Sequence, residues 1–110
     1  MVVRQRNKKF MKSQIDGDTL TISGVKELGA SNANSFRAHT RAALTEAQRI
    51  IEIDLSQTAF VDSCGLGALI SLHKLACTRN GQVRLLNPTP AVQQILELTR
   101  MHRIFDIIQR

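Results

Sequence analysis

Aromatic residues are scarce in this 110-residue chain, which contains no Trp, no Tyr and only four Phe. Its core is therefore expected to be aliphatic. The scarcity argues against a stacking platform for single-stranded nucleic acid, because such surfaces use exposed aromatic rings. The sequence has no run of about 18 apolar residues, the length needed to span a membrane. Its first residues lack the apolar stretch of a signal peptide. We expect a cytoplasmic protein without a membrane span.

Cysteine and histidine are also few. Cys64 and Cys77 fall within one predicted helix, whose thirteen intervening steps separate them by roughly 20 Å, too far for a disulfide. The three histidines, His39, His73 and His102, lie far apart in the sequence, and no closely spaced His/Cys pair exists. We therefore expect neither a structural metal site nor a cofactor.

Acidic residues are absent from the first twelve positions, which carry five of the Lys and Arg residues. The remaining 98 residues hold ten basic and nine acidic side chains, so the net charge of +6 belongs mainly to the N-terminus. We expect a disordered basic tail over residues 1–12 and a single domain over 13–110. One possible function is nucleic-acid binding through this tail, which predicts that binding weakens steeply as the salt concentration rises.

Hydrophobic periodicity predicts alternating strands and helices. Strands are expected at 10–15, 19–24, 49–55 and 82–86, helices at 33–47, 63–79 and 89–100, and a short helix or strand at 104–108. Asn80-Gly81 is typical of a left-handed pair that ends a helix, and Thr89 with Pro90 is typical of a helix start. This order predicts an α/β domain with a mixed sheet, whose sites gather at the carboxyl ends of the strands.

The segment from Asp54 to Leu69 is the densest candidate site. A strand ends, a seven-residue loop at 56–62 carries apolar anchors, and a helix opens with two glycines in its first turn. Ser63 is predicted to be the N-cap of this helix. Gly65 and Gly67 each lower helix propensity by about 1 kcal/mol relative to Ala. This cost indicates that side chains are absent here so that another group can approach the backbone closely. A phosphate on Ser63 would lie over unpaired N–H groups and beside the like charge of Asp62.

Catalytic readings of this segment fail on spacing. Gly65-Leu-Gly67 lacks the third glycine of a dinucleotide loop and the Gly-Lys-Ser/Thr of a P-loop. Ser63 has no Gly two residues before it, unlike a nucleophile elbow. His73, ten residues further along the helix, is roughly 15 Å away and too far to act as its base. We expect no enzyme; a redox thiol at Cys64 is an alternative that the neighbouring Asp62 opposes.

The signature Asp54-Leu-Ser … Phe60-Val-Asp62-Ser63-Cys64-Gly65-Leu66-Gly67-Ala68-Leu69 resembles that of STAS domains, in particular bacterial anti-sigma factor antagonists. Further similar stretches are Ile22-Ser-Gly24, Asn80-Gly81, Leu86-Asn87-Pro88-Thr89-Pro90 and Leu96-Glu-Leu98-Thr99 … Ile104-Phe105, so the resemblance covers roughly residues 13–108. It implies a sheet of four to five strands with three to four helices packed mainly on one side.

The resemblance also implies a partner-switching function. Ser63 corresponds to the serine that a kinase phosphorylates; this kinase is also the anti-sigma factor, and a serine phosphatase resets the switch. The implied partner-binding residues are Phe60, Val61, Asp62, Ser63, Cys64, Gly65, Leu66 and Gly67. Two departures stand out: Cys64 replaces a second serine, and Gly29 replaces an acid of many relatives. The alternative is a constitutive interaction or scaffold module, in a sensor or a transporter-associated complex, in which Ser63 is only a helix cap.

Overall fold

The computed structural model describes residues 11–110, so residues 1–10, which make up most of the expected basic tail, lie outside the described part. Five strands, three α-helices and a short 3-10 helix follow one another along residues 11–110. Their bounds are β1 Lys12–Asp16, β2 Thr19–Ser23, α1 Ala33–Ala43, β3 Ile50–Asp54, α2 Ser63–Cys77, β4 Gln82–Leu86, α3 Pro90–Leu98, η2 Met101–Arg103 and β5 Asp106–Ile108.

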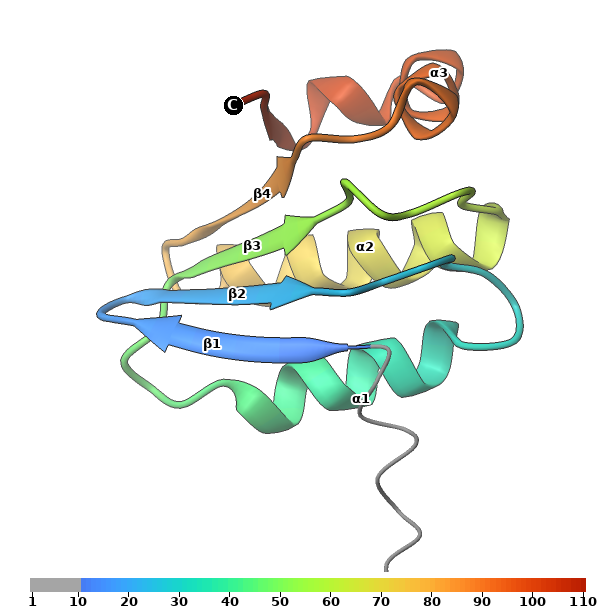
Figure 1. Cartoon of the computed structure of the whole chain (residues 1–110). Coiled ribbons are helices and arrows are strands. Elements are labelled where there is room, and N and C mark those ends of the chain that lie inside the picture. Colours follow the sequence, from blue (N-terminus) through green and yellow to red (C-terminus); the bar gives the residue numbers. More distant parts are fainter. Residues whose placement is uncertain (1–10) are drawn as a thin grey trace, which may run out of the picture.

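The strands form one mixed sheet in the order β1-β2-β3-β4-β5 (Figure 1). β1 runs antiparallel to β2, and the other neighbours are parallel. The two-residue turn between β1 and β2 places Gly17 at a φ of 64°, a left-handed conformation that glycine adopts without steric cost. The predicted mixed sheet is confirmed, and both α1 and α2 lie on the same side of it in Figure 1.

Strand alternation explains why the helices cover one face. Side chains at every second position of the central strands point into the core, where they pack against the helices. These buried strand residues are Leu20, Ile22, Ile51, Ile53, Val83 and Leu85. The helices contribute mainly Phe36 from α1, Leu69 and Leu72 from α2, and Val92 and Leu96 from α3. As the sequence predicts, the core is almost entirely aliphatic.

The opposite face of the sheet carries a polar row across neighbouring strands. Glu52 on β3 accepts a hydrogen bond from the Thr21 hydroxyl at 3.2 Å and an ion-pair contact from Arg84 at 3.3 Å. Arg110 lies 3.8 Å from the same carboxylate. Glu52 is mostly buried by these neighbours and is paired, as a buried charge must be. No helix within residues 11–110 has the length and apolar character needed to cross a membrane.

The first helix is shorter than predicted, ending at Ala43 instead of residue 47. Leu44 is extended, and the side chain of Gln48 accepts hydrogen bonds at 2.8 Å from both the backbone N–H and the hydroxyl of Thr45. These bonds favour a turn over another helical turn. The apolar spacing that continues to Ala47 is therefore not helical, because a side-chain contact satisfies the backbone instead.

The second helix begins at Ser63 as predicted and ends two residues early, at Cys77. The expected left-handed pair after it is half right: Asn80 has a φ of 59°, whereas the φ of Gly81 is not positive. The third helix has the predicted start, since the Thr89 side chain accepts from the Val92 N–H and Pro90 occupies the first turn. The C-terminal segment contains both predicted options, a 3-10 turn followed by β5.

The N-terminal boundary of the domain differs slightly from the prediction. β1 begins at Lys12, so this residue, counted with the tail in the sequence, is the first residue of the sheet. Because Lys12 pairs with Ser23 on β2, its backbone belongs to the folded domain.

Candidate functional site

Two loops run side by side at the carboxyl ends of β2 and β3 and position the start of α2. The backbone N–H of Leu28 donates to the carbonyl of Phe60 at 3.1 Å, and the N–H of Asp62 donates to the carbonyl of Leu28 at 3.1 Å. Leu28 and Val61 thus form a parallel bridge outside the main sheet. This short ladder fixes the approach of the chain to α2, so residues 60–67 are held by backbone bonds.

Asp62, and not Ser63, is the N-cap of α2. One oxygen of its carboxylate, Oδ1, accepts from the backbone N–H of Cys64 at 2.8 Å and of Gly65 at 3.1 Å. The other, Oδ2, accepts from the N–H of Ala30 at 3.0 Å. The prediction of Ser63 as the cap is therefore wrong. Asp and Ser are nearly equal as N-caps, so the pair Asp62-Ser63 was ambiguous from sequence, and the bond to Ala30 carried no sequence signal.

These bonds change the electrostatics of the helix start. Backbone N–H groups, that of Gly65 most and then that of Ala30, lower the pKa of Asp62 below the ordinary value of an aspartate. Cys64 contributes in the same direction, while desolvation opposes the shift. The charged carboxylate of Asp62 therefore joins the loop that follows β2 to the first turn of α2 through hydrogen bonds.

We expect Asp62→Asn to lower the melting temperature at neutral pH. Because the pKa of Asp62 is lowered in the folded state, its contribution to stability is present at neutral pH and is lost as the pH falls below about 4, the ordinary range of an aspartate. The difference between wild type and Asp62→Asn should thus shrink in acid. Thermal unfolding between about pH 7 and pH 3 checks this. Glu27→Gln, which removes an exposed carboxylate of the adjoining loop, is the control, and an equal pH response in both variants would contradict the assignment.

Ser63 is the first residue of α2 and is exposed, as is Cys64. No hydrogen bond joins the Ser63 hydroxyl to another group within residues 11–110. A phosphate on Ser63 was expected to lie over unpaired N–H groups at the helix start, but those of Cys64 and Gly65 already bind Asp62. The expectation of unpaired N–H groups is therefore wrong for Cys64 and Gly65, and the Ser63 hydroxyl has no hydrogen bond within residues 11–110.

The glycines near the site serve different purposes. A Cβ on Gly65 would lie 2.1 Å from the carbonyl oxygen of Leu28, so the close approach at this position is made by the chain's own loop. A Cβ on Gly67 would meet nothing within 4 Å. A Cβ on Gly29 would lie 2.6 Å from Oδ2 of Asp62. Gly29 therefore leaves the space that the Asp62 carboxylate occupies.

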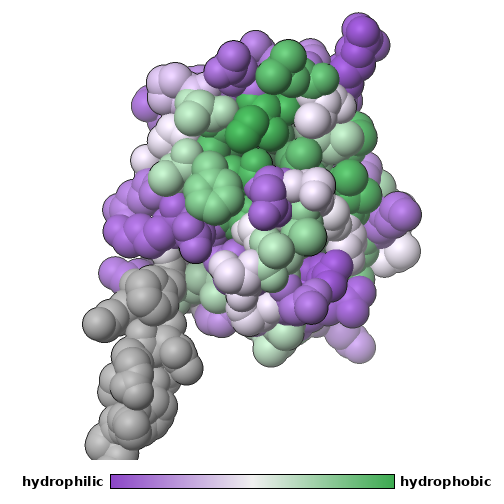
Figure 2. Space-filling model, turned by 90° about the vertical axis from the view of Figure 1, so that its right-hand side faces the viewer, coloured by the Kyte–Doolittle hydropathy of each residue, from purple (hydrophilic) through white to green (hydrophobic). Residues whose placement is uncertain are grey.

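The eight predicted partner-binding residues divide by exposure. Phe60, Ser63, Cys64 and Gly67 are exposed, Phe60 with 43% of its surface accessible, while Asp62 and Leu66 are half-buried and Val61 and Gly65 are buried. Val61 anchors the loop in the core, so its side chain does not face outward. Figure 2 views the side toward which β2 and β3 point in Figure 1, and shows apolar residues gathered in the upper half of that face.

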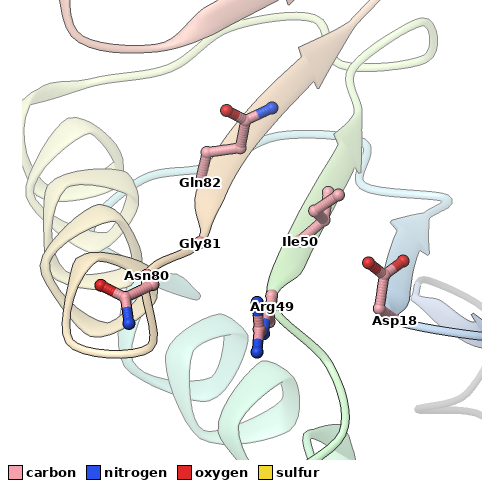
Figure 3. A pocket seen from close by; sticks show the side chains of 6 residues that line it. All are labelled: Asp18, Arg49, Ile50, Asn80, Gly81 and Gln82. Carbon is pink, nitrogen blue, oxygen red and sulfur yellow. The ribbon is translucent and has the colours of Figure 1, made fainter.

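A second candidate lies at the opposite, amino-terminal edge of the parallel strands. A shallow hollow of about 300 Å³ is lined by Asp18, Arg49, Ile50, Asn80, Gly81 and Gln82. In Figure 3 its polar side chains point in different directions instead of toward a common centre. Within residues 11–110, no group of three or more His, Cys, Asp or Glu side chains could hold a metal ion. The hollow is therefore a weaker candidate than the start of α2.

Nearly the whole chain is similar to known proteins. A family model described as the STAS domain matches residues 10–110. A STAS-domain containing protein of Pseudomonas aeruginosa is 35% identical over 95 residues, covering 84% of this chain and 90% of that protein. A Thermotoga maritima protein, provisionally named an anti-sigma factor antagonist, is 28% identical over 95 residues, covering 86% of this chain and 84% of that protein.

Solved structures agree on the fold. A Thermotoga maritima crystal structure with the same provisional name has a TM-score of 0.83 at 24% identity, over 91% of this chain and 86% of that one. The anti-sigma factor antagonist SpoIIAA of Bacillus is known in unphosphorylated and phosphorylated forms. They give TM-scores of 0.78 and 0.71, both at 20% identity, over 91% of this chain and 87% and 90% of theirs. The resemblance seen in the sequence is confirmed: this chain belongs to the STAS domain family.

Proposed function

We propose that this protein is an anti-sigma factor antagonist that switches partners through phosphorylation of Ser63. Unphosphorylated, it binds an anti-sigma factor that is also a serine kinase. Phosphorylation of Ser63 releases that partner, and a serine phosphatase restores the binding form. The observation that carries the proposal is the exposed Ser63 hydroxyl at the first turn of α2, free of bonds within residues 11–110 while Asp62 satisfies the helix cap.

The surroundings of Ser63 favour a binding surface. Phe60 exposes 43% of its surface directly before the helix, although large aromatic side chains are usually buried. Gly67 leaves open space on the same turn, which would let a partner approach the backbone of α2. Since the bridge between Leu28 and Val61 holds the loop, this surface is preorganised and loses little entropy on binding.

The position of Asp62 determines how a phosphate would act. Its carboxylate already binds the N–H groups of Cys64 and Gly65, so a phosphate on Ser63 would not be neutralised by them. The phosphate would add about −1.5 to −2 charge beside an existing carboxylate. In a partner interface such a charge, buried without a counter-ion, costs several kcal/mol. That cost is enough to dissociate a micromolar complex.

The two departures from the family pattern bear on recognition. A side chain at position 29 would force the Asp62 carboxylate to move from its place in the cap, so the acid that many relatives carry there would compete with this cap. The kinase would therefore recognise Ser63 without that acid. Cys64 is exposed next to Ser63 and has no hydroxyl, which leaves Ser63 as the acceptor at the start of α2.

The test compares wild type, Ser63→Ala and Ser63→Asp as baits for proteins of the source cell, identified by mass spectrometry. We expect wild type and Ser63→Ala to retain a kinase of the anti-sigma type and Ser63→Asp to lose at least about tenfold in binding. Incubation of the captured kinase with ATP should phosphorylate wild type and not Ser63→Ala.

Ser35→Asp is the matched control, because Ser35 is an exposed serine in the first turn of α1. It adds the same charge to a different helix start and should bind like wild type. Equal capture by all baits would overturn the switch and favour the scaffold alternative, in which Ser63 has no regulatory role.

A further inference from the structure

The outer edge of β1 is a second surface with a specific shape and charge pattern. Within residues 11–110, β1 has a strand neighbour on one side only, and all five of its residues are exposed. Figure 1 shows it along the border of the sheet. Ile15 leaves 47% of its surface accessible there. An exposed edge strand with unpaired backbone groups is a template for adding another strand.

The hydrogen bonds of β2 define which backbone groups of β1 face outward. The carbonyl of Asp18 accepts from the N–H groups of Arg49 and Ile50, so alternate residues of β2 starting there face β3. The residues between them, such as Thr19 and Thr21, face β1. Their partners on β1 are Asp16 and Gln14, and Lys12 follows the same alternation.

It follows that Ser13 and Ile15 direct their backbone N–H and C=O groups away from the sheet. A strand that pairs with this edge must present its own outward groups opposite these two residues. In an antiparallel pair of two identical strands, this holds when Ser13 of one copy faces Ile15 of the other, because two residues so placed exchange both hydrogen bonds. Gln14 then lies on the two-fold axis, opposite Gln14 of the second copy.

Charge selects this register from the others that the edge allows. With Gln14 on the axis, Lys12 of each copy lies opposite Asp16 of the other. Such a pair, not hydrogen-bonded through its backbone, brings side chains closest, and opposite charges stabilise it. Shifting the register so that Ser13 faces Ser13, or Ile15 faces Ile15, removes both Lys–Asp pairs. The sequence Lys12-Ser-Gln-Ile-Asp16 is thus complementary to itself.

The other face of the strand supports the same arrangement. Ile15 pairs with Leu20 across the hairpin and so lies on the helix side of the sheet, yet it remains exposed. In the self-paired register, Ile15 of one copy is the diagonal neighbour of Ile15 of the second copy. Long side chains at diagonal positions make contact across strands. Pairing would therefore cover the exposed apolar side chain of this edge.

From these observations we propose that the protein forms a symmetric dimer by antiparallel pairing of β1 with β1 of a second copy, which joins the two sheets into one. The two-fold axis is perpendicular to the sheet, so the carboxyl ends of the parallel strands point in opposite directions in the two copies. The start of α2 stays accessible in both. This inference does not depend on the proposed switch at Ser63.

Sedimentation of the full chain from about 10 µM to 1 mM tests the proposal. The interface is small, in the size range of weak and transient complexes, so we expect a concentration-dependent approach to twice the monomer mass. Lys12→Glu and Asp16→Lys should each weaken association at least about fivefold, because each places like charges opposite one another. The double variant Lys12→Glu/Asp16→Lys should restore it. Melting curves of all variants establish that the monomer remains folded.

A cysteine at the axis tests the register directly. Gln14→Cys should form an intermolecular disulfide under mild oxidation, since an antiparallel pair of this kind holds its Cα atoms within the range of a disulfide. Wild type controls for Cys64 and Cys77, which are both exposed. A monomer throughout the concentration range overturns the proposal. So does a dimer that the single charge reversals leave unchanged, or one that the double variant fails to restore.

Discussion

Gly65→Ala is expected to lower the melting temperature by roughly 10–20 °C, corresponding to about 3 kcal/mol for a domain of this size. The added Cβ would lie 2.1 Å from the carbonyl oxygen of Leu28 and 2.7 Å from its carbonyl carbon. Both are backbone atoms, so no side-chain rotation relieves the overlap. The loop after β2 must move away from α2, which also breaks the bonds that Asp62 makes to both. Thermal and urea unfolding measure the loss.

Gly67→Ala is the matched control, two residues further along the same helix. A Cβ there meets no atom within 4 Å and lies on the exposed side of α2. Alanine should therefore raise the stability by up to about 1 kcal/mol through its higher helix propensity. If both variants were destabilised equally, helix geometry and not the contact with Leu28 would explain Gly65.

Gly81→Ala is expected to be at least as destabilising, again by about 3 kcal/mol or more. Its Cβ would lie 1.7 Å from the carbonyl oxygen of Arg49, the residue directly before β3. The same carbonyl accepts the N–H of Gln82 at 3.2 Å, so the overlap would separate β4 from β3 where their pairing begins. If Gly81→Ala accumulates as soluble protein, unfolding in urea measures the loss of stability. If it does not, a lowered refolding yield measures the loss.

Asn80→Gly provides the comparison at the neighbouring position. Asn80 has the left-handed φ of 59° that glycine adopts freely, so its replacement should change the stability by less than about 1 kcal/mol. A large loss in Asn80→Gly with none in Gly81→Ala would show that the helix end depends on Asn80 and that the Arg49 contact is unimportant.

Local patterns were enough to predict most of the fold. The alternation in Thr19–Ser23, the β-branched run in Ile50–Asp54 and the Thr89-Pro90 start of α3 lie within single elements, where spacing alone defines the buried face. The mixed sheet followed from the order of these elements. The location of the candidate site followed as well, because sites gather where parallel strands end and a helix begins.

Contacts between segments distant in sequence decided what the patterns left open. The cap of α2 is Asp62 because Ala30, 32 residues earlier, donates to its second oxygen. Likewise the need for glycine at positions 29, 65 and 81 depends on Asp62, Leu28 and Arg49. The end of α1, by contrast, depends on a local bond between Thr45 and Gln48.

By itself, then, the sequence determined the α/β order, the aliphatic core and the segment that carries the candidate site, since each depends on residues a few positions apart. Only the tertiary structure decided which carboxylate caps α2, that the Ser63 hydroxyl is left free, and that β1 is an exposed strand at the border of the sheet. The physical reason is that a hydrogen bond or steric contact between two loops depends on the distance between their atoms in space. Residue type and spacing do not report that distance until the chain is folded.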